Sequence, residues 1–391
     1  MTSHCSIIGM DAVTALGASA DATWREMLRG TCGIRQMRRF DPGLYMTAVA
    51  GEIPPEIDAA CGEPDCPGEF GRCFLLAHHA AANAIRNATG SLGVVSGGRT
   101  ALVLATAKAG LAEFERAIEQ GRQTGPGHFN AFAMAEDLAR ALGIGGPVLA
   151  VSNACASGLA AIIQAALLLE RGDADVAVVA GADVLARFTL AGFSCLGALS
   201  ARPCRPYDAS RDGLSLGEAA AAMVLVREPP RGAGLACVRG WAMTNDASHI
   251  TSPLHTGDGL RRAIAAALQA AGTGASDVDF INGHGTGTVQ NDEMEAQAIN
   301  AIFGGNTPPV SSMKGYFGHT LGAAGVVEAV LCVMAMRDSM VPASLGFRGL
   351  GVSKPLNIAA SHSRLPSLET VLTVKCGFGG INAAVVLGKQ D

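Results

Sequence analysis

The 391-residue chain is poor in charge: only 16% of its residues are Asp, Glu, Lys or Arg, whereas 49% are hydrophobic. Its formal net charge is −5, and it has no run of lysines or arginines that could neutralise a row of phosphates. The sequence therefore lacks the charge pattern of a nucleic-acid-binding protein. So little charge predicts interior layers covered on both faces, and an oligomer that hides further surface.

The chain also lacks long apolar runs and paired cysteines. No stretch approaches the roughly 18 consecutive apolar residues of a membrane span, and the first residues, MTSHCSIIGMDAVTALG, contain no basic region of a secretory signal. Its eleven cysteines are irregularly spaced without C-x-x-C pairs, which is typical of reduced thiols in a cytoplasmic protein. Cys61, Cys66 and Cys73 form a loose cluster whose spacing suits no common zinc site, so we expect no metal.

What the sequence does contain is a regular alternation of short apolar runs with longer Ala-rich helical patterns. This alternation is typical of an α/β protein with buried sheets. The clearest predicted strands of the first half lie within residues 100–107, 146–153, 174–183 and 219–228.

Paired prolines and glycines in REPPRGAGLA, residues 227–236, mark the best candidate for a boundary. Beyond it the order of elements begins again, with a strand, an amphipathic helix and a second strand predicted over 236–246, 257–272 and 278–285. The pattern therefore predicts two similar halves, residues 1–230 and 231–391.

A single cysteine, Cys155, stands among small residues in SNACASG, where an apolar strand ends and a helical run begins. Unpaired N–H groups and the dipole at a helix N-terminus stabilise a thiolate, so the position suits a nucleophile with a lowered pKa. Cysteine is also among the most frequently buried residue types and often only fills space. The local sequence leaves both interpretations open.

His284 lies between two glycines in NGHGTGT, at the end of an apolar strand. It is either an accessible functional imidazole or a histidine that bonds to the loop backbone. Thr286 and Thr288 place two hydroxyls beside it that suit hydrogen bonding to a polar substrate arm. The acidic NDEMEA then begins a helix, with Asp292 and Glu293 expected in its first turn.

Lys314 and His319 stand five residues apart in the glycine-punctuated segment SSMKGYFGHTLGAAG, which leads into an almost wholly apolar helix. Lys314 is either a solvated surface lysine or a buried one that needs a counter-charge, for which Glu328 of that helix is the nearest candidate. Residues 371–387 form a further motif, predicted as a strand, a glycine turn around Phe378 and a second strand.

Four motifs, taken in chain order, resemble those of the β-ketoacyl-acyl carrier protein synthases, the elongating ketosynthases of the thiolase superfamily. They are NACASG, NGHGTGT, SSMKGYFGHTLGAAG and CGFGGINAA. The resemblance extends to GFSCLGALS, RPYDASRDGLSLGEAAAAMVLV and NDASHITSP, and so spans nearly the whole chain. It implies an α/β, thiolase-like five-layered αβαβα fold of two similar halves that dimerises. It also implies a decarboxylative Claisen condensation of a cysteine-bound acyl chain with a malonyl thioester on acyl carrier protein. No cofactor is expected, because the substrates are carried on the phosphopantetheine of that protein.

The resemblance assigns four catalytic residues and one that supports them. Cys155 matches the nucleophile that takes up the acyl group. His284 and His319 match the pair that assists decarboxylation and stabilises the enolate. Lys314 matches the lysine that orients this site, with Glu328 as its ion partner.

It also assigns residues around the substrate. The backbone N–H groups of Cys155 and Phe378 match the oxyanion hole, and Phe378 also matches a gate residue. Phe193 matches a residue at the acyl pocket, and Thr286 and Thr288 match contacts to the phosphopantetheine arm.

The sequence departs from the family in three places. GEAAAAMVLV is poorer in glycine than usual, and CGFGGIN carries unfamiliar residues at Cys376 and Ile381. Residues 51–80 hold six acidic residues with Arg72 as the only basic one, where the family often presents basic residues to the carrier protein. We therefore expect carrier docking through other arginines or through a partner subunit.

RDGLSLGEAA is closer to ketosynthases of type II polyketide or aryl-polyene pathways, which often pair with a chain-length-factor subunit lacking the cysteine. We expect a homodimer, or a heterodimer with such a subunit. Acyl chain length and pathway stay open.

Two other functions are weighed against this one. A thiolase acting on acyl-coenzyme A would use a second reactive cysteine near the C-terminus, for which Cys376 is the candidate. A catalytically silent partner subunit would lack the nucleophile, whereas Cys155 is present. His319 argues for the elongating class, because initiating and chalcone-type enzymes have a Cys-His-Asn arrangement instead.

Overall fold

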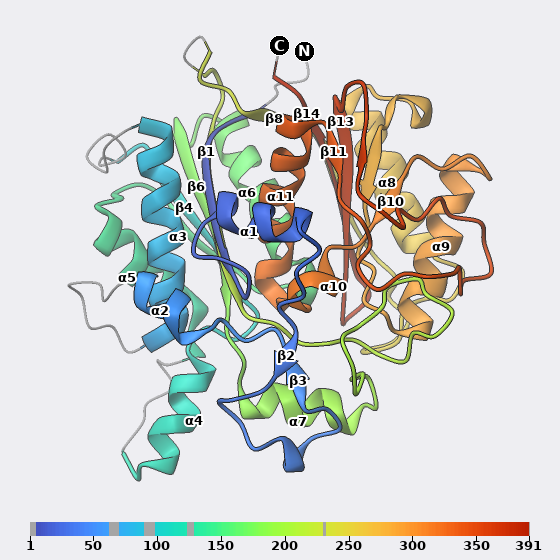
Figure 1. Cartoon of the computed structure of the whole chain (residues 1–391). Helices are drawn as coiled ribbons and strands as arrows, with labels where there is room; N and C mark the ends of the chain where they lie inside the picture. The colour runs from blue at the N-terminus through green and yellow to red at the C-terminus, as the bar shows by residue number, and fades with distance from the viewer. Residues whose placement is uncertain (1–4, 62–69, 90–97, 123–128, 230–231, 391) are drawn as a thin grey trace.

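The computed structural model describes residues 5–61, 70–89, 98–122, 129–229 and 232–390 (Figure 1). The helices are α1 (Ala20–Leu28), α2 (Pro55–Cys61), α3 (Gly71–Thr89), α4 (Leu111–Glu119), α5 (Ala131–Leu142), α6 (Ser157–Glu170), α7 (Arg187–Cys195), α8 (Asp258–Ala271), α9 (Val289–Phe303), α10 (Lys314–Phe317) and α11 (Ala324–Asp338). The 3-10 turns are η1 (Pro42–Leu44), η4 (Ala154–Ala156), η5 (Ala275–Asp277) and η6 (Leu321–Ala323). The strands are β1 (Cys5–Thr14), β2 (Arg35–Gln36), β3 (Val49–Ala50), β4 (Thr100–Ala105), β5 (Val148–Val151), β6 (Val176–Asp183), β7 (Ala219–Val226), β8 (Ala236–Asn245), β9 (Phe280–Asn282), β10 (Val310–Ser311), β11 (Met340–Val341), β12 (Ser363–Arg364), β13 (Thr370–Gly377) and β14 (Ile381–Gly388).

The main sheet has the strand order β10-β9-β13-β14-β8-β1-β7-β6-β4-β5. It consists of two five-stranded halves that are joined only where β1 and β8 pair, between Cys5–Ile7 and Ala236–Val238. Counted from this junction, each half has the same arrangement: two antiparallel pairings followed by two parallel ones. The predicted repetition of one fold in two similar halves is therefore confirmed.

Helices cover both faces of each half (Figure 1). Apolar side chains of α3 and α5 pack on the outer face of the first half, and those of α8 and α9 on the outer face of the second. Helices α6 and α11 lie between the two halves and fill the central core. The layers thus run helix, sheet, helix, sheet, helix, which confirms the predicted αβαβα fold.

Strands β4, β5, β6 and β7 lie where the sequence predicts strands, and α11 is as deeply buried as its apolar sequence suggests, from Ala324 to Met336. One helix start differs. Helix α9 begins at Val289, so Asp292 lies in its first turn but Glu293 does not. The predicted boundary between residues 230 and 231, and Cys66 of the loose cysteine cluster, lie outside the described residues.

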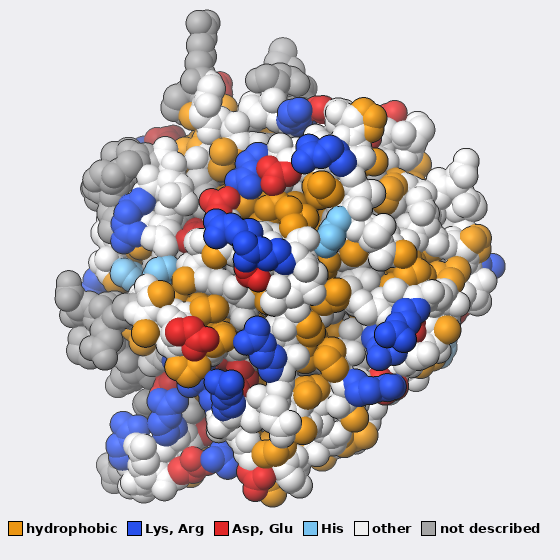
Figure 2. All heavy atoms as spheres, viewed as in Figure 1, with side chains coloured by type: hydrophobic (Ala, Val, Ile, Leu, Met, Phe, Trp, Pro, Cys, Tyr) orange, Lys and Arg blue, Asp and Glu red, His pale blue; other side chains and the backbone are white. Residues whose placement is uncertain are grey.

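On the face shown in Figure 2, acidic and basic side chains lie beside one another rather than in blocks of one sign. Within the described ranges, no helix is long and apolar enough to cross a membrane. Over the same part of the chain, no group of three His, Cys, Asp or Glu side chains is arranged to hold a metal ion.

The two central helices begin in the same way, and this start positions the site. Each follows a 3-10 turn that opens with a non-glycine residue at positive φ, Ala154 at 49° and Leu321 at 53°, a conformation uncommon outside glycine. The helices then touch through Gly158 and Gly325, because a Cβ on Gly158 would come within 2.7 Å of the Gly325 Cα.

Candidate active site

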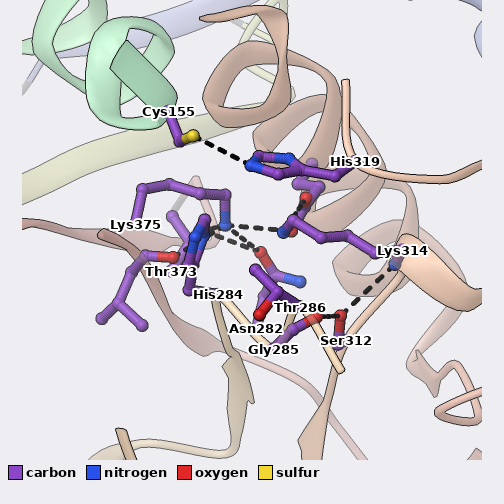
Figure 3. Close-up of polar contacts among 12 residues, drawn as sticks. Cys155, Asn282, His284, Gly285, Thr286, Ser312, Lys314, His319, Thr373 and Lys375 are labelled. Atoms are coloured by element: carbon purple, nitrogen blue, oxygen red, sulfur yellow. Dashed lines mark hydrogen bonds and ion pairs between the residues drawn. The ribbon is translucent and has the colours of Figure 1, made fainter. Parts of the chain in front are cut away.

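Cys155 lies in η4, between the end of β5 and the start of α6, and the residue is only 8% exposed. Two hydrogen bonds fix this turn: the Asn153 N–H donates to Ser157 Oγ at 2.8 Å, and the Ser157 hydroxyl donates to the Ala154 carbonyl at 2.6 Å. Cys155 Sγ lies 2.9 Å from His319 Nε2 (Figure 3). The local sequence thus presents the thiol to an imidazole of the other half.

The expectation of a lowered cysteine pKa is wrong. Burial raises the pKa of Cys155 to about 11, although the positive charges of Lys314 and Lys108 act in the opposite direction. The helix N-terminus favours a thiolate, but the loss of water around a buried sulfur outweighs it. At neutral pH Cys155 is therefore a thiol, and it needs a base to become a nucleophile. His319 Nε2 is within reach of its proton.

His284 follows β9 and His319 follows α10, and their rings meet nearly at right angles, with centroids 5.2 Å apart. Burial, reinforced by the positive charge of Lys314, holds the pKa of both imidazoles well below its ordinary value. Both rings are therefore neutral near neutral pH. A neutral imidazole has one N–H to donate and one lone pair to accept a proton.

Two buried carboxylates of α9 hold the loop that carries His284. Glu295 accepts hydrogen bonds from the backbone N–H groups of His284 and Gly285, and Asp292 accepts one from the Thr286 N–H at 3.0 Å. Because α9 is packed in the outer helical layer, these bonds fix the direction of the His284 loop. Asp292 thus does more than complement the helix dipole.

A buried ion cluster lies next to the two imidazoles (Figure 3). Glu328 Oε1 lies 2.6 Å from Lys314 Nζ, and Glu328 Oε2 lies 2.9 Å from Lys375 Nζ; all three side chains are 0% exposed. Lys314 and Glu328 are the pair that the sequence suggests, whereas Lys375 was not identified. Its signal was a charged residue inside the apolar strand VLTVKCG, because a lysine is almost never fully buried unless it is paired.

Cys155, His284 and His319 line a pocket of about 420 Å³. The full lining also includes Phe193, Leu196, Gly197, Ala198, Asp212, Gly213, Leu214, Asp246, Thr251, Ser252, Pro253, Thr286, Thr288, Val289, Gln290, Asn291, Cys376, Gly377, Phe378, Gly380 and Asn382. Mixed polar and apolar walls of this kind suit a ligand with an apolar chain and a polar arm.

Two aromatic rings stack in this lining: Phe193 of α7 and Phe378 of the β13–β14 turn, with centroids 5.5 Å apart. A Cβ on Gly377 would lie only 3.3 Å from the Cys155 backbone nitrogen, so the turn packs against the cysteine. Cys376 also lines the pocket, but burial raises the pKa of its thiol well above the ordinary value.

The remaining predicted residues, Thr286 and Thr288, lie in the same lining, and their hydroxyl groups form a hydrogen bond of 2.9 Å. The structure therefore brings together the side chains to which the resemblance assigns a catalytic, supporting or substrate-binding role. Lys314 and Glu328 lie behind the pocket rather than in its wall.

Comparisons with known proteins give one consistent result. The family model of the β-ketoacyl synthase N-terminal domain matches residues 3–230, and that of the β-ketoacyl synthase C-terminal domain matches residues 235–348. The 3-oxoacyl-[acyl-carrier-protein] synthase 2 of Staphylococcus aureus (strain COL) is 32% identical over 406 residues, covering 98% of this chain and 98% of that protein.

Two solved structures resemble the whole chain. The ishigamide ketosynthase/chain length factor matches with a TM-score of 0.91 at 26% identity, covering 99% of each chain. A ketosynthase in complex with its chain length factor from Xenorhabdus doucetiae matches with a TM-score of 0.87 at 30% identity, covering 99% of this chain and 98% of that one.

Proposed function

The chain belongs to the β-ketoacyl synthase family, and on that basis we propose that Cys155, His284 and His319 carry out its condensation. The reaction is a decarboxylative Claisen condensation: an acyl chain held on a cysteine joins a malonyl thioester on acyl carrier protein and gives a β-ketoacyl thioester. The observation that carries the residue assignment is the 2.9 Å contact between Cys155 Sγ and His319 Nε2 inside the pocket.

In the first half-reaction, Cys155 takes up the acyl chain. Its thiol proton passes to His319 Nε2 while Sγ attacks the thioester carbonyl of the donor. The backbone N–H groups of Cys155 and Phe378 stabilise the oxyanion that forms. One C–S bond forms and one breaks, and the leaving carrier thiolate takes the proton.

In the second half-reaction, the malonyl thioester loses its carboxylate as CO2, and the electron pair passes into an enolate. The N–H groups of the two neutral imidazoles, His284 and His319, stabilise the enolate oxygen, which is why their low pKa values matter. The enolate carbon then attacks the Cys155 thioester. A C–C bond forms, the C–S bond breaks, and the cysteine thiolate takes up a proton.

The other pocket residues bind the substrate. Thr286 and Thr288 would hydrogen-bond the phosphopantetheine arm, while Phe193 and Phe378 would contact the acyl chain and gate its entry. Lys314 would orient the site with Glu328 as its counter-charge. The proposal needs no cofactor beyond the arm that carries the substrates.

The competing functions fit less well. A thiolase would use Cys376 as a second reactive cysteine, yet the nearest described titratable partner of Cys155 is His319, and Cys376 has a strongly raised pKa. A catalytically silent subunit is at odds with a complete set of Cys155, His284, Lys314 and His319 in one pocket region.

For partners, we propose acyl carrier protein and a second subunit. The relative from Xenorhabdus doucetiae is a ketosynthase in complex with its chain length factor, which favours a heterodimer with such a subunit. A homodimer is the alternative. We also propose a cytoplasmic location, where the carrier substrates would be available.

Mass spectrometry of the intact protein tests the function. After mixing with acyl-acyl carrier protein or, separately, acyl-coenzyme A, we expect an acyl adduct on Cys155 from the carrier-bound donor. The adduct is lost in Cys155→Ala and kept in the matched variant Cys376→Ala. An adduct that persists in Cys155→Ala, or none from any donor, would contradict the proposal.

A further inference from the structure

Lys375 is fully buried near the catalytic groups. The proposed mechanism gives this lysine no role. Its Nζ donates hydrogen bonds to the Val374 carbonyl at 2.8 Å, Asn282 Oδ1 at 3.1 Å and Thr373 Oγ1 at 3.5 Å, and it forms an ion pair with Glu328 Oε2 at 2.9 Å. A lysine ammonium has three N–H groups and no lone pair. Burial lowers the pKa of Lys375 from its ordinary value, whereas the adjacent Glu328 carboxylate raises it. Because Nζ meets only acceptors, one of them a carboxylate, Lys375 is held as a cation.

Lys375 contacts two residues that position catalytic groups: Glu328, which pairs with Lys314, and Asn282, which lies near His284. Glu328 joins Lys375 to Lys314, because each lysine takes a different carboxylate oxygen. Asn282 is the last residue of β9 and precedes His284 by two positions. Lys375 therefore fixes, through one carboxylate and one amide, both the second lysine and the strand end from which His284 projects (Figure 3).

The charges of this cluster do not cancel. Two ammonium groups, Lys314 and Lys375, face the single carboxylate of Glu328 in a region that water does not reach. One positive charge is left over next to the two histidines. In a medium of low dielectric constant, such a charge opposes protonation of a neighbouring imidazole and favours an anion.

We infer that Lys375 is a positioning residue for the decarboxylation half-reaction: it fixes Glu328 and Asn282, and its charge keeps both imidazoles neutral beside the developing enolate. This inference rests on the proposed function of the site. Acyl transfer to Cys155 forms its oxyanion at backbone N–H groups instead. At pH values where His319 is neutral, Lys375 should therefore matter little for that step.

The charged and titratable groups that face the histidines come from several elements. They are Lys314 of α10, Lys375 of β13, Lys108 after β4, Cys155 of η4, Glu295 of α9 at the His284 backbone, and each imidazole for the other. The lysine charges all lower the pKa of His319, and Lys314 and Lys375 lower that of His284. Without Lys375, the pair Lys314 and Glu328 is neutral overall, so both pKa values should rise.

The test compares Lys375→Met with Lys389→Met, a matched control at an exposed lysine that pairs with Glu369. Each variant is assayed for Cys155 acylation by mass spectrometry and for release of CO2 from malonyl-acyl carrier protein across a pH series. At neutral and higher pH we expect Lys375→Met to acylate Cys155 within about threefold of wild type but to decarboxylate malonyl-acyl carrier protein about 10- to 100-fold more slowly. The acidic limbs of both pH–rate profiles should move up by on the order of one pH unit, because both steps need a neutral His319. Lys389→Met should match wild type in every measurement.

Lys375→Gln provides a second variant that loses the charge but keeps hydrogen-bond donors, in case Lys375→Met does not fold. It should show the same shift of the acidic limb with a smaller loss of rate. Equal losses in both half-reactions with an unmoved acidic limb would overturn the inference, and so would unchanged decarboxylation. A wild-type protein that fails to acylate Cys155 would instead contradict the proposed function itself.

Discussion

The central helices α6 and α11 share one geometry but carry different chemistry. Cys155 in the turn before α6 corresponds to Gly322 in the turn before α11, and the buried Glu328 of α11 corresponds to Ala161 of α6. A side chain at residue 322 would collide with Asp183, whose Oδ2 accepts the Gly322 N–H at 2.7 Å. The repeat therefore supplies a common frame, while the nucleophile comes from one half and the charges and imidazoles from the other.

Glu328→Gln should have the largest effect on stability, because it leaves Lys314 and Lys375 as two buried ammonium groups without a carboxylate. Removing one partner of a buried pair costs about 3–5 kcal/mol. Urea unfolding, followed by circular dichroism, measures the change. Glu170→Gln, at the end of α6, is the control in the other central helix and should stay within about 0.5 kcal/mol of wild type.

A Glu328→Gln protein as stable as the wild type would mean that the lysines shed their protons. The buried carboxylate of α11, which has no counterpart at Ala161 of α6, would then contribute nothing to stability.

The two histidines offer the next comparison, since only His319 contacts Cys155 Sγ. His319→Ala should slow both acylation of Cys155 and malonyl decarboxylation, whereas His284→Ala should slow decarboxylation alone. Loss of one hydrogen-bond donor to a developing oxyanion costs about 100- to 1,000-fold in rate. Single-turnover acylation and CO2 release separate the two steps, and an acylation defect in His284→Ala as large as that in His319→Ala would contradict this division.

Sequence reasoning succeeds where a residue type and its neighbours are sufficient. Glycines around His284 and before His319 mark loops, and the apolar run after His319 predicts a buried helix with Glu328 inside it. The prediction of a thiolate at Cys155 is wrong because the sequence indicates where a helix starts but not how deeply the sulfur is buried. Sequence reasoning does not identify Lys375 for a similar reason. Its partners, Glu328 and Asn282, lie 47 and 93 residues away in sequence, and only the folded arrangement brings them together.

The closest approach of the two helices gives the smallest predicted effect. A Cβ on Gly158 would lie 2.5 Å from the Val326 nitrogen, and a Cβ on Gly325 would lie 2.3 Å from the Leu159 nitrogen. Because both neighbours are backbone atoms of a buried helix, Gly158→Ala and Gly325→Ala should each destabilise the fold by about 1–3 kcal/mol. Thermal unfolding measures both.

Gly192→Ala is the matched control, because a Cβ there meets nothing within 4 Å and Gly192 is an exposed residue of helix α7. It should leave stability unchanged or raise it by up to about 1 kcal/mol, since alanine favours a helix over glycine. If the repeat is as symmetric in energy as in geometry, the losses at Gly158 and Gly325 should be similar. A loss of stability in Gly158→Ala alone would show that the start of α6, next to the nucleophile, is more tightly packed than the start of α11.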